Sequence, residues 1–334
     1  MAAPNFDATR LGLINNAGGG SFAGDNAMFL KVWAGEVLTA FRKATVFEAL
    51  HKVRTISSGK TASFPIIGVN SATYHTPGTQ IIGTQQKVAE ANINVDDKLI
   101  SSVFLADIDE AKNHYDVRSQ FSTEMGNALA YRYDQNVAAI IAKAARTATN
   151  FNTDLPGGTS GAANADFRIT VGASKSAITG AQLAAKLFAA AQKMDENNLP
   201  ENDRYCCLAP AEYYKLVQTT DVINRDWGGQ GAYADGTVLK VAGIDIIKSN
   251  HLPSTNRAAA AGENNAYDAN FTNSVALIWN PMCAGTVKLM DLKMETTGGD
   301  IHALWQGTFM VASMACGTGV LRPDCAIEIT WAAA

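Results

Sequence analysis

The feature that most constrains this chain is a long stretch with the periodicity of a helix. No proline occurs between residues 107 and 147, and Gly126 is the only glycine there. Apolar residues recur at spacings of three or four, and Asp107 with Glu110 resembles the start of a capping box. About 40 residues at 1.5 Å each span roughly 60 Å, which is longer than a small domain of ~30 Å. We therefore predict a helical spine, in which Gly126 is the one candidate for a break.

Two strands separated by a long polar gap precede the spine. Residues 61–67 read as a strand with Pro65 at an edge position, and residues 88–96 alternate apolar and polar side chains. The stretch 68–87 between them has no periodicity and is rich in Gly, Thr, Gln and Asn. Because a structureless loop of about 20 residues is unusual inside a compact domain, we interpret it as the tip of a two-stranded arm. A lone two-stranded ribbon is marginal in water, so this arm needs another surface to lie on.

The N-terminal part is predicted to be a flexible arm followed by a helix. Residues 1–24 are rich in Gly, Asn, Ser and Ala, which is typical of mobile termini. Asp25 is a good N-cap residue for a helix that follows it. In that helix an apolar residue recurs every four positions and forms a stripe on one face, made of Phe29, Trp33, Val37 and Phe41.

Beyond the spine, the chain mixes helices, strands and loops. Local signals predict a helix at 180–197 capped by Thr179, a strand at 205–208, a helix from Pro210 and a hairpin at 238–247 that turns near Gly243. The connections are 150–176, 224–237 and 253–270. The last part of the chain is mostly strand, with a buried run at 275–279 and alternating residues at 290–295 and 325–331.

Few residues are charged. Lys, Arg, Asp and Glu make up 17% of the chain, against about 25% in an average soluble protein. The apolar residues, at 47%, are enough for a sizeable core. The 27 basic and 31 acidic residues give a net charge of −4, which argues against a globally basic nucleic-acid-binding protein and against an acidic disordered chain. The low charge indicates that part of the surface does not face water.

The five cysteines include no C-x-x-C pair, so neither a disulfide framework nor a zinc ribbon is expected. They are expected to be buried and reduced. The chain shows neither a signal peptide nor the ~18 consecutive apolar residues of a membrane-spanning helix. We therefore expect a cytoplasmic protein with no membrane segment.

The sequence Gly59-Lys60-Thr61 resembles the end of a phosphate-binding loop. That motif needs a glycine five residues earlier, where this chain has Arg54, and a helix afterwards, where this chain has a predicted strand. We interpret it as a turn at the base of the arm. The histidines show no i, i+4 spacing, and the acidic residues at 107–110 fit a helix start better than a calcium loop. No catalytic residue, metal or cofactor is expected.

Five blocks in order along the chain carry a resemblance to a known family. They are residues 29–41 (FLKVWAGEVLTAF), 53–65 (VRTISSGKTASFP), 111–119 (AKNHYDVRS), 285–289 (GTVKL) and 321–323 (LRP). These blocks strongly resemble major capsid proteins of short-tailed phages of the T-seven group, the autographiviruses. The order of predicted parts is similar to the Hong Kong 97 type capsid subunit. The stretches 145–178 and 224–270 do not match.

The resemblance implies an α+β Hong Kong 97 type fold with a discontinuous subunit, in which the peripheral part is built from both sides of an axial insert. Its expected parts are an N-terminal arm and helix (1–49), the extended hairpin called the E-loop (50–102), a peripheral domain with the spine helix (103–177), an axial domain (178–275) and peripheral closing strands (276–334).

The resemblance also implies a function. The chain is expected to be a non-enzymatic major capsid protein that forms hexamers and pentamers of an icosahedral shell. Expected partners are further copies of itself, a scaffolding protein and a portal, and the shell encloses double-stranded DNA without sequence-specific binding. Assembly is expected in the host cytoplasm, and the product is the virion. The alternatives are a cellular nanocompartment shell of the same fold and, in another class, a phosphate-handling α/β enzyme that uses Gly59-Lys60-Thr61.

Candidate residues for contacts between subunits are likewise taken from the resemblance. They are Phe29, Trp33, Val37, Phe41, Arg54, Lys60, Phe64, Ile66, Tyr115 and Arg118. For the stripe that contains Trp33 and Phe41, two hypotheses stay open. It packs either on a neighbouring subunit or on the spine of its own subunit.

Overall fold

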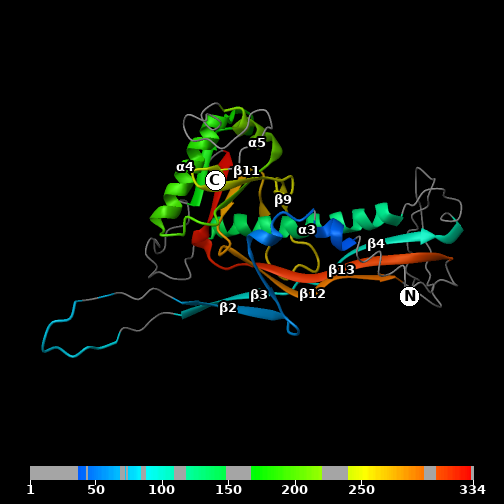
Figure 1. The fold of residues 1–334 in the computed structure, drawn as a ribbon, viewed down its shortest axis with the longest axis horizontal. Coiled ribbons are helices and arrows are strands. Elements are labelled where there is room, and N and C mark those ends of the chain that lie inside the picture. The colour runs from blue at the N-terminus through cyan, green and yellow to red at the C-terminus, as the bar shows by residue number, and fades with distance from the viewer. Residues whose placement is uncertain are drawn as a thin grey trace. The chain divides into compact units, whose positions relative to one another are not determined.

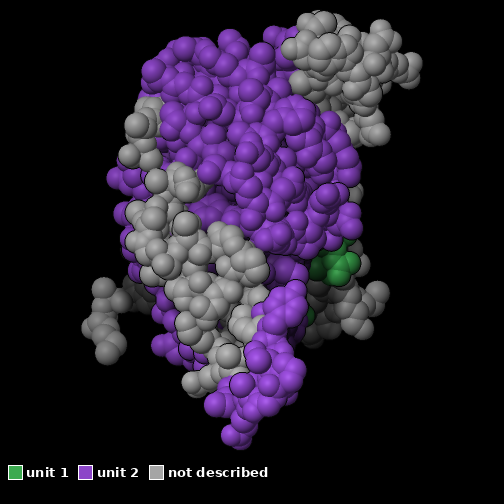
Figure 2. All heavy atoms as spheres, turned by 90° about the vertical axis from the view of Figure 1, so that its left-hand side faces the viewer, with its two compact units in different colours: residues 1–46, 96–133, 288–316 green, residues 47–95, 134–287, 317–334 purple. Residues whose placement is uncertain are grey.

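The computed structural model describes residues 37–42, 44–67, 72, 74–83, 88–108, 118–147, 167–219, 240–296 and 306–331. The chain divides into two compact units, each made of three separate stretches (Figure 2). Unit 1 comprises Met1–Val46, Asp96–Tyr133 and Lys288–Cys316, and unit 2 comprises Phe47–Val95, Asp134–Val287 and Gly317–Ala334. Within the described residues, no helix is long and apolar enough to cross a membrane.

The predicted spine is present as the helix α3 (Arg118–Arg146, Figure 1). The predicted positions 109–117 lie outside the described residues. The helix continues without a break through Gly126, where a β-carbon would lie 2.7 Å from the carbonyl oxygen of Val37 and 2.8 Å from Cβ of Ala40. Gly126 is therefore a packing residue that lets the helical segment 37–42 approach α3.

A four-stranded sheet has the order β1 (Lys52–Thr55), β12 (Ala284–Thr296), β13 (Gly307–Val320) and β4 (Leu99–Ala106). β13 and β4 are antiparallel, with Gly307 opposite Ala106 and Met314 opposite Leu99. The alternation at 290–295 belongs to β12, which begins earlier, at Ala284.

A six-stranded sheet in unit 2 has the order β5 (Arg168–Gly172), β14 (Ala326–Trp331), β11 (Ser274–Trp279), β6 (Tyr205–Leu208), β8 (Ile244–Lys248) and β7 (Lys240–Val241). The apolar run at 275–279 is buried in β11, as predicted. β5 lies within the stretch 150–176, so the prediction of a plain connection there was wrong for residues 168–172. This strand pairs in parallel with β14, which is a distant partner in the sequence.

The helices α4 (Gly180–Glu196) and α5 (Pro210–Val217) also belong to unit 2 and lie next to each other (Figure 1). Thr179 and Gln182 form the capping box of α4, which explains why this helix begins where predicted. Gly243 has a φ of 76°, which fits the predicted turn between β7 and β8. The described residues also include short 3-10 helices at Glu48–Leu50, Lys175–Ala177 and Pro323–Cys325.

The predicted arm is an antiparallel hairpin of β2 (Thr61–Ile67) and β3 (Val88–Asn94) (Figure 1). All seven residues of each strand are paired, from Thr61 opposite Asn94 to Ile67 opposite Val88. A second, very short pair is formed by β9 (Asn256–Arg257) and β10 (Ala269–Asn270). That pair lies in the stretch predicted as the loop 253–270.

Candidate assembly surface

The two faces of the β2–β3 hairpin differ in character. On one face, Thr61 Oγ1 donates to Asn94 Oδ1 and Ser63 Oγ donates to Asn92 Oδ1, each at 2.8 Å. On the other face, the apolar side chains nearest the root are buried, namely Ala62, Ala91 and Ile93. Cross-strand pairs of both kinds stabilise the ladder. The hairpin is therefore fixed to its own subunit by its root.

Beyond its root, the hairpin exposes several large apolar side chains. Ile67 and Val88 face each other across the strands and are 64% and 70% exposed, and Ile81 and Ile82 beyond them are 78% and 83% exposed. Tyr74 is fully exposed as well. Large apolar side chains that a subunit leaves exposed are candidates for contact with another protein. The hairpin thus carries a surface that a single chain leaves uncovered in this part of the molecule.

The basic residues predicted near the arm lie at its base. Arg54 in β1 donates to the carbonyl of Ser63 at 3.1 Å, and its guanidinium carbon lies 5.6 Å from the ring centroid of Phe64. This contact combines a hydrogen bond with a cation–π interaction. Gly59 has a φ of 106°, and the carbonyl of Lys60 accepts from Val95 N at 2.8 Å. The interpretation of Gly59-Lys60-Thr61 as a turn at the base of the arm is confirmed.

Ile93 is the principal apolar anchor of the hairpin root and is fully buried. A β-carbon at Gly319 would lie 2.8 Å from its Cγ1, and one at Gly285 would lie 3.2 Å from its Cδ1. Gly285 also packs against Leu321. Two blocks of the resemblance, 285–289 and 321–323, therefore begin with residues that pack at the hairpin root or next to it.

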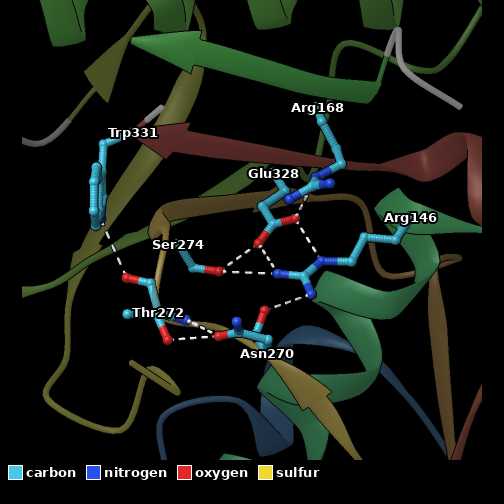
Figure 3. Close-up of polar contacts among 7 residues, drawn as sticks. All are labelled: Arg146, Arg168, Asn270, Thr272, Ser274, Glu328 and Trp331. Carbon is cyan, nitrogen blue, oxygen red and sulfur yellow. Dashed lines mark hydrogen bonds and ion pairs between the residues drawn. The ribbon is translucent and has the colours of Figure 1, made fainter. Parts of the chain in front are cut away.

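A buried cluster of charged side chains in unit 2 is a candidate for a catalytic site among the described residues (Figure 3). The fully buried Glu328 accepts from Arg146 Nε at 2.7 Å, from Arg146 Nη2 at 2.5 Å and from Arg168 Nε at 3.2 Å. Ser274 Oγ donates to the same carboxylate. Because both oxygens of Glu328 are occupied, this cluster ties together α3, β5, β11 and β14 and offers no free acid or base.

The buried acid Asp134 has a similar structural role. Its Oδ1 accepts from the backbone N–H of Phe47 at 3.3 Å, and its Oδ2 lies 2.7 Å from His251 Nδ1. Cys207 lies near Asp134, but burial raises the pKa of this thiol far above its ordinary value. A thiol held in its neutral form is a poor nucleophile, so the group does not resemble an activated cysteine site.

The structure places the predicted contact residues in three groups. Phe29, Trp33 and Tyr115 lie outside the described residues, and of Ile66 and Arg118 only the backbone positions in β2 and at the start of α3 are described. Arg54 and Phe64 are in contact at the base of the hairpin, and Lys60 directly precedes β2, where its carbonyl accepts from Val95 N. Val37 and Phe41 are buried within unit 1, where the ring of Phe41 lies 6.0 Å from that of Tyr133 in α3. This end of the stripe therefore packs on the spine of its own subunit, and a contact of the stripe with a neighbour stays a prediction.

Residues that sequence reasoning missed are the exposed apolar side chains of the hairpin. The pair Ile81-Ile82 stands out as apolar within the polar stretch 68–87 and could have been found from that contrast. The roles of Asn264 and Asn265 at the hairpin root, described below, have no such signal in the sequence.

Comparisons with known proteins agree on one class. A family model described as Gp10A-like major capsid protein matches residues 63–330. The major capsid protein of Escherichia phage T7 is 32% identical over 325 residues, which cover 91% of this chain and 92% of that protein. In the capsid structure of cyanophage P-SCSP1u, a chain with 62% identity superposes with a TM-score of 0.79 and covers 99% of this chain and all of that one. A subunit of the mature capsid of bacteriophage PhiM1 shares the fold at 17% identity and a TM-score of 0.70, over 87% of this chain and 88% of that one.

Proposed function

The chain belongs to the Gp10A-like family of major capsid proteins and has the Hong Kong 97 type capsid fold, and from this premise we propose that copies of it close into an icosahedral shell of hexamers and pentamers. The matching family and relatives are structural proteins of phage heads, so the chain is a virion component and not an enzyme. The shell is proposed to enclose double-stranded DNA.

The observation that carries this proposal is the set of apolar side chains that the β2–β3 hairpin and its tip leave exposed. Ile67, Val88, Ile81 and Ile82 are all more than half exposed. Full burial of one such side chain stabilises a contact by about 1.5–3 kcal/mol. A neighbouring subunit supplies the apolar surface that these side chains need, and the hairpin then braces one subunit on the next.

The domain boundaries within the subunit are proposed from the resemblance. Residues 50–102 form the E-loop, residues 178–275 form the axial domain around the capsomer centre, and residues 103–177 and 276–334 form the peripheral domain. The N-terminal arm and helix at 1–49 precede them. Contacts between subunits are proposed for the basic and aromatic residues at the hairpin base, Arg54, Lys60 and Phe64, and for the residues beyond the described region, Phe29, Trp33 and Tyr115.

The proposed partners follow from the same resemblance. A scaffolding protein and a portal take part in assembly of a procapsid in the host cytoplasm. Contact with DNA is not sequence-specific. The net charge of −4 argues against strong electrostatic binding of DNA phosphates, which would need a basic surface.

Electron microscopy of the purified full chain, expressed with and without its scaffolding protein, tests this function. We expect closed shells of uniform size that contain DNA when they are isolated from infected cells. Small discrete particles under all conditions would refute the shell. Closed shells filled with a cargo protein would instead favour a nanocompartment.

A further inference from the structure

Two neighbouring asparagines hold the root of the hairpin from outside the ladder. Asn94 N donates to Asn265 Oδ1 at 3.2 Å, and Asn265 Nδ2 donates to the carbonyl of Asn94 at 2.7 Å. Asn264 Nδ2 donates to the carbonyl of Val95 at 2.8 Å. The side-chain amide of Asn265 thus makes the same donor and acceptor pair with β3 that a residue of an adjacent strand would make.

Gly317 in β13 makes room for this pairing. A β-carbon at Gly317 would overlap the carbonyl oxygen of Asn94 and would lie 2.8 Å from Asn265 Nδ2. Any side chain at this position would therefore separate Asn265 from the hairpin. The close approach explains why a glycine stands in the middle of a long strand.

The segment that carries the two asparagines is itself fixed. Arg257 and Glu263 form an ion pair within it, and the guanidinium carbon of Arg257 lies 5.2 Å from the ring centroid of Tyr267, which is almost fully buried. The hydroxyl of Tyr267 accepts from Thr318 N in β13 at 2.8 Å. The segment is therefore held in unit 2 by contacts of its own, apart from those that it makes with the hairpin.

The same segment is bound to the C-terminal half of α3. Arg257 Nη2 donates to Asn136 Oδ1 at 2.6 Å, and Lys143 Nζ donates to the carbonyl of Asp268 at 3.0 Å. Arg146 Nη1 donates to the carbonyl of Asn270 at 2.8 Å. Hydrogen bonds thus run from the spine helix through this segment to the base of β3.

We propose that the segment Asn256–Asn270 is a clamp that sets the direction in which the hairpin leaves the subunit, with Asn264 and Asn265 as its positioning residues. The inference rests on the proposed function, in which the hairpin braces a neighbouring subunit. Seven residues at about 3.3 Å each make strands of ~23 Å, so a rotation of ~10° at the root moves their far end by ~4 Å. That displacement is enough to take Ile67 and Val88 out of contact with a neighbour.

The test compares Asn265→Ala and Asn264→Ala with Asn280→Ala. Asn280 is the control because its side chain, which is more buried than those of Asn264 and Asn265, makes three hydrogen bonds, with Asn202, Asp203 and Met282, but none with the hairpin. Hydrogen exchange of residues 61–67 and 88–94 is measured in the unassembled full chain, and the yield of closed shells is counted by electron microscopy. Gly317→Ala tests the contact between Asn94 and Asn265 as well, because the added β-carbon would lie between them.

For Asn265→Ala we expect exchange in the hairpin to rise about tenfold, since two hydrogen bonds are lost, and the yield of closed shells to fall. Asn264→Ala is expected to do the same more weakly, and Asn280→Ala to leave both hairpin exchange and shell yield unchanged. Unchanged hairpin exchange in Asn265→Ala and Gly317→Ala would overturn the clamp.

Two further results would distinguish a failure of the clamp proposal from a failure of the proposed function on which it rests. If exchange rises and shells stay normal, while deletion of residues 70–86 abolishes them, the positioning role is refuted and the bracing role stands. If shells stay normal in the deletion as well, the bracing role itself is refuted, and the clamp loses its role in assembly with it.

Discussion

Arg146 binds both carboxylate oxygens of Glu328, through Nε at 2.7 Å and through Nη2 at 2.5 Å. This is a fork-shaped, charge-assisted pair between the last residue of α3 and the middle of β14. Arg168 adds a third hydrogen bond to the same carboxylate. Glu328 is fully buried; the two guanidinium groups balance its charge, and Ser274 Oγ adds a hydrogen bond.

The variant Glu328→Gln is expected to destabilise the subunit by about 3–5 kcal/mol, because removal of one partner leaves buried charges uncompensated. Urea unfolding of the unassembled subunit, followed by far-UV circular dichroism, measures this change. The control is Glu295→Gln, which breaks an ion pair with Lys293 at an exposed position and should leave the midpoint unchanged. Equal midpoints for Glu328→Gln and wild type would contradict the structural role of the cluster.

Gly126→Ala is expected not to stabilise the protein, although alanine favours helices. The gain in helix propensity is about 1 kcal/mol. The added β-carbon would meet the carbonyl of Val37 at 2.7 Å, and overpacking of this kind costs about 1–3 kcal/mol. Thermal unfolding should therefore show a lower or equal Tm. Gln120→Ala, at an exposed position of the same helix, serves as the control, and a clear rise of Tm in Gly126→Ala would show that the contact with residues 37–42 is not made.

Elements with local signals were predictable from the sequence. The capping box of Thr179, the proline that opens α5 and the turn at Gly243 each act within a few residues. The strands β2 and β3 follow from alternation and from the apolar residues of their buried face. In such cases the physical cause of the structure lies inside the segment itself.

Elements stabilised by distant partners were not predictable. β5 is a strand because β14 pairs with it in parallel, about 160 positions along the chain, and one of its residues balances Glu328. The alternation in 325–331 reads as a strand with one polar face, but Glu328 and Thr330 are both fully buried, so the second face is part of the core. The sequence likewise carries no signal for the role of Gly317 and Gly319 in β13, where the absence of a side chain allows the close approach of Asn94 and Ile93. For the assembly surface, sequence alone indicated the arm but not the side chains that it exposes.

The double variant Ile81→Ser, Ile82→Ser is expected to leave folding unchanged and to impair closure of shells. Both side chains are mostly exposed in the subunit, so their loss removes no internal contact. Each loses about 1.5–3 kcal/mol of burial in the proposed contact, and this loss recurs at every subunit. Sedimentation velocity gives the fraction of chain in closed shells. Gln80→Ser is the control at the same tip, and a normal shell fraction in the double variant would count against the apolar contact.

The buried thiols are expected to resist modification in the native protein. Burial raises the pKa of Cys325 to about 12 and raises the pKa values of Cys206, Cys207 and Cys283 as well. The reactive thiolate is therefore nearly absent at pH 8. Titration with a disulfide reagent at that pH should detect at most Cys316, which is only half-buried, before denaturation and all five thiols after it. Rapid reaction of several thiols in the folded chain would mean that the regions around these cysteines open readily.

The same raised pKa values make the folded state sensitive to alkali. An ordinary thiol with a pKa near 9.0 loses its proton in the unfolded chain, while Cys325 keeps its proton in the folded chain up to about pH 12. The native state then binds more protons than the unfolded state, so stability is fully present below pH 9 and is lost as the pH rises toward 12. For Cys325 alone, the free energy of unfolding should fall by about 1 kcal/mol between pH 9 and pH 10. Urea unfolding of wild type and Cys325→Ala at both pH values isolates this contribution, since tyrosines and lysines titrate alike in the two proteins. A pH-dependence that is as steep in Cys325→Ala as in wild type would assign the alkaline instability to other groups.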